Sequence, residues 1–243
     1  MSPQVWFISG ANRGIGFGLA QLVAANGNIV FGGARTPSKA TALQKLAATN
    51  PNVHVVKLES TSASDVAAAA KTVEATTGGV DVVVANAGIA NNWQKATDAS
   101  VDAVYEHFRV NAVGPLLLFQ ALYPLLLKRE TRKFVVVSSI AGSMTIATNI
   151  PVPLTVYGAS KAAVNFITET IHKEHKEEGF TVFPIHPGMV ATDMGEAAKE
   201  TFGAGWNPIT TEQSVEGLFK VIDGATKEQS GKFVGYDGSE LPW

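Results

Sequence analysis

The sequence has 243 residues, of which 46% are hydrophobic and 16% charged, so it can bury a substantial core and is neither disordered nor fibrous. Its formal net charge of −2 at pH 7 is too balanced for a protein that binds nucleic acid by neutralising phosphates. The lack of cysteine excludes disulfides and zinc–thiolate sites. The N-terminus lacks the features of a signal peptide, and the most apolar stretch, residues 113–127, is shorter than the about 20 residues that span a membrane. We therefore expect a cytoplasmic protein that binds neither membrane nor nucleic acid.

The charges are unevenly distributed along the chain. The first 58 residues contain five basic residues and no Asp or Glu, so this segment carries +5 and the rest of the chain −7. A solvated basic face is one interpretation of this segment. The alternative, an anionic ligand bound in the N-terminal part, depends on the motifs described below.

Short apolar runs alternate with longer alanine-rich stretches, which predicts strands alternating with helices. Two of the runs, 82–84 and 135–137, consist of valine alone, which is typical of parallel strands buried on both faces. The pattern predicts an α/β fold, a doubly wound sheet of seven parallel strands that forms a single domain over residues 1–243. The expected strands are 5–9, 29–34, 53–58, 80–85, 134–138, 181–185 and 231–234, and the expected helices are 15–26, 39–49, 63–77, 100–127, 156–178 and 212–225.

The segment 194–210 breaks this alternation. It combines several glycines with Phe202 and Trp206, and it lies between a strand and the last helix. Ligands of doubly wound sheets bind at the carboxyl ends of the strands, so we interpret the segment as a lid over a substrate. An ordinary surface loop with two anchoring aromatic residues is the alternative.

The first strand runs directly into a glycine-rich turn and then into a helix. Gly10, Gly14 and Gly16 have the spacing G-x-x-x-G-x-G. Glycines at such a junction allow a tight turn and a close approach of the backbone to a pyrophosphate, which the helix N-terminus attracts. The position of the motif, more than the glycines alone, predicts a dinucleotide-binding (Rossmann-type) fold.

The end of the second strand bears on which dinucleotide is bound. An NAD site usually has a carboxylate there for the ribose 2′-hydroxyl, but this sequence has Ala34 followed by Arg35. An arginine can pair with the 2′-phosphate of NADP, and Arg13 in the glycine turn can reach the same region. We therefore predict NADP(H) in preference to NAD(H).

Tyr157 and Lys161 are four residues apart in a predicted helix, so their side chains share one face. An ammonium group near a phenol stabilises the phenolate, which predicts a lowered pKa for Tyr157 and acid–base chemistry. Ser139 follows a buried strand, where its hydroxyl could donate to a substrate carbonyl oxygen, although a polar strand end alone would explain a serine. Ser138 is the rival for this role.

Together these motifs resemble the short-chain dehydrogenase/reductase family over nearly the whole chain. The resemblance implies that Tyr157 protonates the carbonyl oxygen and that Ser139, which fits the family spacing better than Ser138, binds the same oxygen. It also implies that Lys161 holds the nicotinamide ribose and that Asn111 positions a water in a proton relay. The matching residues are Gly10, Gly14, Gly16, Asn86, Ala87, Gly88, Asn111, Ser139, Tyr157, Lys161, Pro187 and Gly188.

The family pattern also implies the remaining cofactor contacts. The segment 86–88 would flank the adenosine ribose, and the segment 187–192 would hold the nicotinamide. Glu59 stands where the family usually has Asp beside the adenine, which leaves its contact in doubt. The cofactor residues expected in this way are Gly10, Asn12, Arg13, Gly14, Ile15, Gly16, Arg35, Glu59, Asn86, Ala87, Gly88, Tyr157, Lys161, Pro187, Gly188, Val190 and Thr192.

Within the family, the tail 236–243 and the insertion 144–156 resemble the branch of C-factor-like, sniffer-type and norsolorinic acid ketoreductase-like proteins. This implies an NADPH-dependent carbonyl reductase for ketones, quinones or aldehydes. Apolar side chains near the expected pocket would suit such substrates, but they could equally be core residues. They are Ile140, Met144, Ile150, Val190, Phe202 and Trp206.

Other functions remain as alternatives. A regulatory or sensor protein could keep the fold and the NADP(H) site without turnover, although such a protein would not need Tyr157 as a proton donor. A methyltransferase would have an acid after the second strand. His172 and His175 lie in a charged stretch typical of a solvated helix face, so no metal is predicted. We expect a small carbonyl or alcohol substrate and allow for a homodimer or homotetramer.

Overall fold

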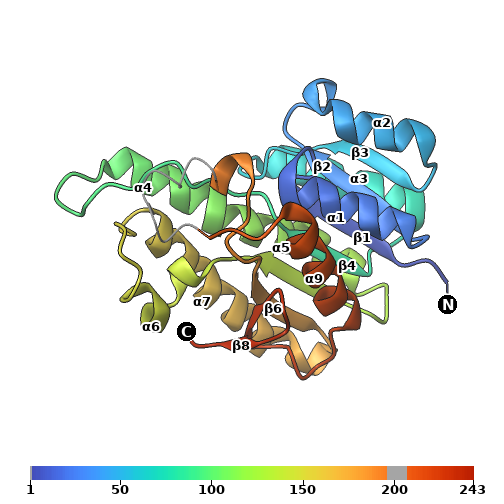
Figure 1. Cartoon of the computed structure of the whole chain (residues 1–243). Coiled ribbons are helices and arrows are strands. Elements are labelled where there is room, and N and C mark those ends of the chain that lie inside the picture. The colour runs from blue at the N-terminus through green and yellow to red at the C-terminus, as the bar shows by residue number, and fades with distance from the viewer. Residues whose placement is uncertain (1, 196–206) are drawn as a thin grey trace.

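The computed structural model describes residues 2–195 and 207–243. Its strands form one sheet in the order β3-β2-β1-β4-β5-β6-β7-β8 (Figure 1). All pairs are parallel except the last, so the seven parallel strands confirm the predicted doubly wound α/β fold. The parallel strands are β1 (Val5–Ser9), β2 (Ile29–Ala34), β3 (Val53–Lys57), β4 (Val82–Ala85), β5 (Lys133–Val137), β6 (Thr181–His186) and β7 (Phe233–Gly235).

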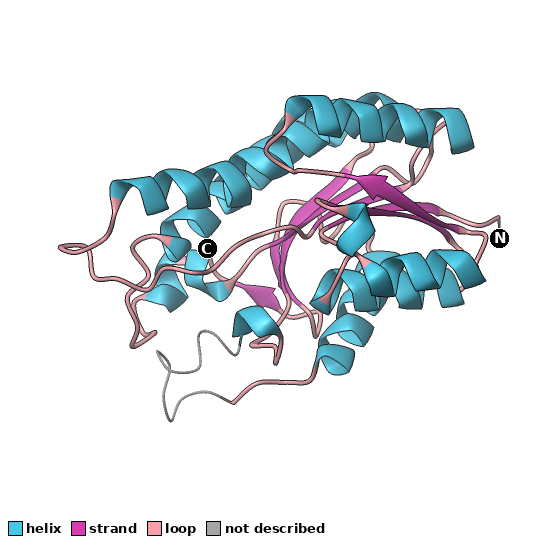
Figure 2. Ribbon diagram, turned by 90° about the horizontal axis from the view of Figure 1, so that it is seen from above, coloured by secondary structure: helices cyan, strands magenta, loops and turns pink. Residues whose placement is uncertain are grey.

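The central strands are apolar on both faces because both faces are covered. Phe7 of β1 is paired with Val83 of β4 and belongs to one core cluster, while the next pair, Ile8 and Val84, belongs to the other. Helices accordingly lie on both sides of the sheet, as Figure 2 shows. One layer consists of α1 (Gly14–Ala25), α2 (Thr41–Thr49) and α9 (Thr211–Gly224), and the other of α3 (Ala63–Thr77), α5 (Gly114–Leu126) and α7 (Tyr157–His175).

The most apolar stretch of the sequence forms α5. Leu118, Leu122 and Leu126 of this helix are buried in the core. Burial of each side chain stabilises the fold by about 1.5–3 kcal/mol relative to leaving it exposed. In the part of the chain that the structure describes, no helix has both the length and the apolar character needed to cross a membrane.

The helix expected over 100–127 is divided. It consists of α4 (Val101–Phe108), a π-helical segment η2 (Arg109–Val113) and α5. The wider turn of a π-helix is often found at functional sites. Here it contains Asn111, which is 1% exposed.

Several short elements were not expected from the sequence. The strand β8 (Glu240–Leu241) runs antiparallel to β7, and the carbonyl of Trp243 accepts hydrogen bonds from the backbone and hydroxyl of Thr145. The C-terminus therefore lies beside α6 (Figure 1). The other short elements are η1 (Pro37–Lys39), η3 (Ile140–Gly142) and α6 (Met144–Ala147), whereas η4 (Lys176–Glu178) is the 3₁₀-helical end of the helix expected over 156–178.

Candidate active site

The glycine turn connects β1 to α1. Gly10 and Gly14 have φ values of +66° and +55°, which glycine adopts without strain, and α1 begins at Gly14. A Cβ on Gly16 would lie 2.4 Å from the carbonyl oxygen of Gly10, so no larger residue fits there. The first N–H groups of α1 are thus free of intrahelical partners at the carboxyl edge of the sheet, where an anionic ligand can bind them.

The segment after β4 is tied to this turn. Ser9 Oγ accepts hydrogen bonds of 3.0 Å from the backbone N–H groups of Asn86 and Ala87, and Asn86 Nδ2 donates to the carbonyl of Ser9. These bonds bring the expected pyrophosphate and adenosine segments together at the point where the strand order reverses.

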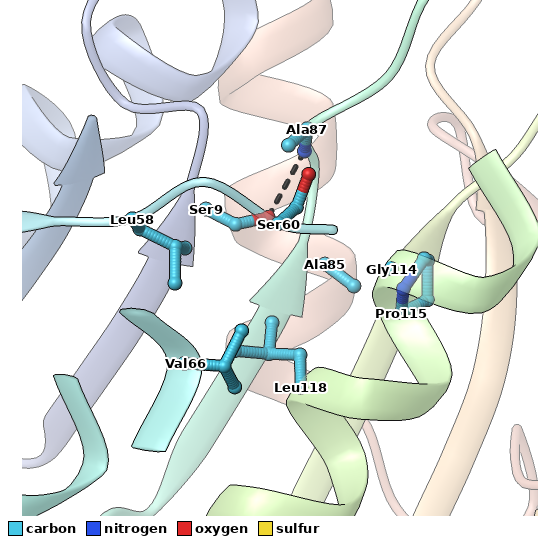
Figure 3. A pocket seen from close by; sticks show the side chains of 9 residues that line it. All are labelled: Ser9, Leu58, Ser60, Val66, Ala85, Ala87, Gly114, Pro115 and Leu118. Atoms are coloured by element: carbon cyan, nitrogen blue, oxygen red, sulfur yellow. Dashed lines mark hydrogen bonds between the residues drawn. The ribbon is translucent and has the colours of Figure 1, made fainter. Parts of the chain in front are cut away.

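A small pocket lies directly beside this junction (Figure 3). Its lining includes Ala87 of the segment after β4 but none of the expected acid–base residues. The lining residues are Ser9, Leu58, Ser60, Val66, Ala85, Ala87, Gly114, Pro115 and Leu118.

The two arginines expected near a 2′-phosphate both have acidic partners. The side chain of Arg35 is 80% exposed, and its Nε lies 3.9 Å from Glu59 Oε2. Arg13 Nη1 lies 2.6 Å from Asp193 Oδ2, so Arg13 links the glycine turn to the segment after β6. Neither ion pair was expected from the sequence, because each joins residues far apart in the chain.

Tyr157, Lys161 and Ser139 meet at the same edge. Tyr157 begins α7, and Lys161, one turn later, has its Nζ 5.9 Å from the Tyr157 ring centroid. Lys161 is 5% exposed and donates a 2.8 Å hydrogen bond to the carbonyl of Val137. Ser139, which caps η3 after β5, is hydrogen-bonded to the phenol of Tyr157.

Burial dominates the titration of both α7 residues. It raises the pKa of Tyr157 to about 12, against the lowering effect of the hydrogen bond with Ser139. It also lowers the pKa of Lys161 to about 8, because the ammonium loses hydration. The expected lowering of the Tyr157 pKa by Lys161 is therefore wrong for this structure, in which desolvation of the phenolate is the larger effect.

The structure separates the two rival serines. Ser138 is 2% exposed, and its hydroxyl donates a 2.5 Å hydrogen bond to Asn165 Oδ1 in the interior. Ser139 is the serine that faces Tyr157. Ser138 and Ser139 follow β5 directly, and successive side chains of an extended backbone point to opposite sides.

The amide of Asn111 connects the segment after β4 with α7. Its Nδ2 donates bonds of 2.9 Å to the carbonyl of Ile89 and to Ser160 Oγ, and its Oδ1 accepts a 2.8 Å bond from the N–H of Ile89. A Cβ on Gly88 would lie 3.1 Å from this Oδ1 and 3.6 Å from Lys161 Nζ. The absence of a side chain at Gly88 thus leaves space between the two groups.

The segment after β6 also reaches the glycine turn. Gly188 has φ +88°, and Val190 forms a parallel bridge with Ile209. A Cβ on Gly14 would lie 3.5 Å from Thr192 Cγ2, which places Thr192 beside the turn. Ser214, near the start of α9, fixes this segment by donating a 2.6 Å hydrogen bond to the carbonyl of Pro187.

The expected substrate residues are only partly described. Ile140 lies in η3 and Met144 in α6, where it is 79% exposed. Phe202 and Trp206, and most of the lid expected over 194–210, lie outside the described residues.

Trp93 was not among the residues expected at the site. Its ring centroid is 5.4 Å from that of Tyr157, with an angle of 58° between the ring planes. No motif marks this residue, and its place in the loop that follows a strand carboxyl end is the one signal available.

The histidine pair on α7 has protein partners. His172 Nδ1 lies 2.7 Å from Ser230 Oγ, and His175 Nδ1 lies 3.1 Å from Glu178 Oε1. Within residues 2–195 and 207–243, no group of three or more His, Asp or Glu residues is arranged to hold a metal ion.

Comparison with known proteins gives a consistent result. The short chain dehydrogenase family model matches residues 4–202. Norsolorinic acid ketoreductase of Aspergillus parasiticus is 37% identical over 248 residues, covering 98% of this chain and 91% of that protein. A short-chain dehydrogenase of Neurospora crassa is 39% identical over 250 residues, covering 98% and 97%.

The NADPH-bound carbonyl reductase from chicken fatty liver has a similar structure, with a TM-score of 0.91, 32% identity and complete coverage of both chains. The carbonyl reductase Sniffer of Drosophila melanogaster gives a TM-score of 0.90 at 27% identity, also with complete coverage. This chain belongs to the short-chain dehydrogenase/reductase family of oxidoreductases.

Proposed function

We propose that the protein is an NADPH-dependent carbonyl reductase. The observation that carries this proposal is the meeting of the Tyr157 phenol, the Ser139 hydroxyl and the Lys161 ammonium at the sheet edge that also holds the glycine turn. The nicotinamide, when bound, supplies a hydride to the carbonyl carbon. The protein's own task is to hold the carbonyl oxygen and to give it a proton.

In this proposal Tyr157 is the proton donor. Because its pKa is about 12, the phenol stays protonated throughout the neutral range and is available as an acid. Ser139, hydrogen-bonded to the same phenol, stabilises charge that develops on the substrate oxygen. Lys161 holds the nicotinamide ribose, and Asn111 Oδ1, facing Lys161 across Gly88, positions the water that returns a proton.

The glycine turn and the segments 86–88 and 187–192 form the cofactor site in this proposal. Arg35, whose Nε lies 3.9 Å from Glu59 Oε2, supplies the NADP preference by pairing with the 2′-phosphate. The chicken carbonyl reductase, which is NADPH-bound in its structure, supports the choice of cofactor. The substrate is a small ketone, quinone or aldehyde reduced in the cytoplasm, bound beside Ile140 and Met144.

Replacement of Tyr157 by Phe tests the proposal. The variant keeps the ring but loses the proton donor, so kcat/KM for NADPH oxidation should fall about 10²–10⁴-fold. The Kd for NADPH, measured by fluorescence titration, should stay within about threefold, because the ring still fills its place. Tyr105→Phe removes a hydroxyl from an aromatic residue that is 65% exposed and serves as the control.

Retained turnover in Tyr157→Phe would contradict the assignment. The wild-type protein should first be assayed with diketones, quinones and aldehydes. Tight NADPH binding without oxidation by any of them would favour the regulatory or sensor function instead.

A further inference from the structure

Alternate residues of the loop after β4 contact other parts of the fold. The Asn111 amide bonds both backbone groups of Ile89. His107 Nε2 accepts a long hydrogen bond of 3.5 Å from the N–H of Asn91, and Trp93 packs against Tyr157. The segment 89–93 is therefore held in place as far as its tryptophan.

The histidine in this arrangement is itself fixed. His107 is 0% exposed, and its Nδ1–H donates a 2.8 Å hydrogen bond to the carbonyl of Ala103. This bond leaves Nε2 as the acceptor that faces Asn91. Because His107 precedes Asn111 by four residues, one continuous helical stretch holds two points of the loop.

Trp93 lies beside the proposed proton donor. A carbonyl oxygen that receives the proton has to lie within hydrogen-bond distance of the Tyr157 hydroxyl. The rest of such a substrate extends from the Tyr157 hydroxyl, and the half-buried indole of Trp93 packs against the ring that carries this hydroxyl. An indole is a broad flat ring system, which is suited to stacking with a second aromatic system.

We propose that Trp93 is a specificity-determining residue that favours flat aromatic carbonyl compounds over compact aliphatic ones. This inference rests on the proposed reductase function, since it assumes that the carbonyl binds at Tyr157. An aromatic substrate gains contact area with the indole, whereas a small aliphatic diketone is held mainly through its oxygen.

The test compares two substrates, 9,10-phenanthrenequinone and 2,3-butanedione, in wild type, Trp93→Phe and Trp93→Ala. The ratio of kcat/KM for the quinone to that for the diketone should fall about 10-fold or more in Trp93→Ala, the scale on which apolar pockets discriminate. Trp93→Phe, which keeps a smaller ring, should lie between. Tyr105→Ala removes an exposed aromatic ring from α4 and should leave the ratio unchanged.

A second measurement does not require turnover. Binding of phenanthrenequinone to the NADP⁺-loaded protein should weaken about 10-fold in Trp93→Ala. An unchanged ratio in Trp93→Ala would overturn the inference. An equal loss with both substrates would also overturn it, because Trp93 would then act on the orientation of Tyr157 and not on the choice of substrate.

Failure of the proposed function has a different signature. If the wild-type protein reduces neither compound and the NADP⁺ complex does not bind the quinone, the reductase assignment itself fails. If the wild-type protein reduces both and only the ratio is insensitive to Trp93, the reductase assignment stands and the specificity role is refuted.

Discussion

Arg35 and Glu59 show how one ion pair can influence cofactor choice. The carboxylate of Glu59 also accepts bonds from the N–H and hydroxyl of Thr61, so it has a fixed position at the end of β3. A 2′-phosphate that approaches Arg35 meets an attractive guanidinium and, a few ångströms further on, a repulsive carboxylate. The proposed NADP preference thus depends on Arg35 outweighing Glu59.

We predict that Arg35→Asp weakens NADPH binding about 10- to 100-fold, the worth of a hydrogen-bonded charge pair. The same change should improve NADH binding, because the new carboxylate can accept a bond from the 2′-hydroxyl. Fluorescence titration of both cofactors measures this. Lys45→Asp, the same change of charge at an exposed position on α2, is the control. Equal wild-type affinity for the two cofactors would refute the preference.

The activity should also depend on pH through the Lys161 ammonium. Since burial lowers the pKa of Lys161 to about 8, the ammonium is present below that pH and is lost as pH rises through it. We expect kcat/KM for NADPH oxidation to fall above pH about 8, because the neutral amine holds the ribose less well. Lys161→Arg, whose group stays charged, should move this fall to higher pH while lowering activity. A rate that stays constant up to pH 10 would contradict the assignment.

The effect of Lys161 on stability has the opposite sign. An unfolded lysine keeps its proton up to about pH 10.5, so between pH 8 and 10.5 the unfolded chain binds more protons than the folded one. The contribution of Lys161 to the free energy of unfolding therefore rises with pH in this window. Stability and activity should diverge above pH 8, which separates loss of the ammonium from unfolding.

At the scale of elements, the sequence predicted what depends on local pattern. The valine runs of β4 and β5 and the glycine turn before α1 lie where they were expected, because a run buried on both faces has few alternatives. The π-helical break at η2 was missed. It depends on the bonds of Asn111 to Ile89 and Ser160, which exist only when three segments are assembled.

The contact between η3 and α7 leads to a prediction about Gly142. A Cβ at this position would lie 2.6 Å from the backbone carbon of Lys161 and 2.8 Å from the nitrogen of Ala162. Gly142→Ala must therefore push η3 away from α7 and separate Ser139 from Tyr157. Misplacement by about 1 Å can cost about 100-fold in rate, so kcat should fall by 10- to 100-fold.

Gly224→Ala is the matched control for this change, because a Cβ there meets nothing within 4 Å. Circular dichroism should show both variants folded, and NADPH oxidation should distinguish them. Full activity of Gly142→Ala would show that Ser139 does not need its present position.

For the whole molecule, the position of the site could be predicted from the sequence, but the side-chain contacts within the site could not. Parallel strands bring their carboxyl ends to one edge, so Gly10, Ser139 and Pro187 could be assigned to the same edge from strand order alone. The partner of Arg13 is Asp193, 180 residues away, and the ring of Tyr157 packs against that of Trp93, which lies in another loop. Such pairs are set by loop paths, which local pattern does not specify.

The structure also explains the uneven distribution of charge along the sequence. Of the five basic residues in the acid-free first 58, Arg13 and Arg35 follow the carboxyl ends of β1 and β2, at the proposed cofactor edge. Lys57 instead pairs with Asp65 at 3.2 Å. The +5 therefore combines proposed cofactor-binding charge with ordinary surface charge.

A buried lysine joins distant parts of the fold. Lys133, the first residue of β5, is 6% exposed and donates hydrogen bonds of 3.0 Å and 2.6 Å to the carbonyls of Ile222 and Asp223. These carbonyls belong to the last turn of α9, whose orphan acceptors and negative dipole end favour a cation. The same helix holds Pro187 through Ser214, so Lys133 supports the proposed nicotinamide segment from the far end of α9.

Lys133→Met keeps the aliphatic length but removes the ammonium donor from both carbonyls, of which that of Ile222 keeps a 3.3 Å bond from the N–H of Ala225. The free energy of unfolding should fall by about 2 kcal/mol, the scale of hydrogen bonds to a charged group. For a chain of this size, Tm should fall by about 4–8 °C. Lys128→Met, which removes an exposed pair with Glu74, should have a much smaller effect. Equal urea midpoints for Lys133→Met and wild type would show that the cap on α9 adds nothing to the stability of the whole molecule.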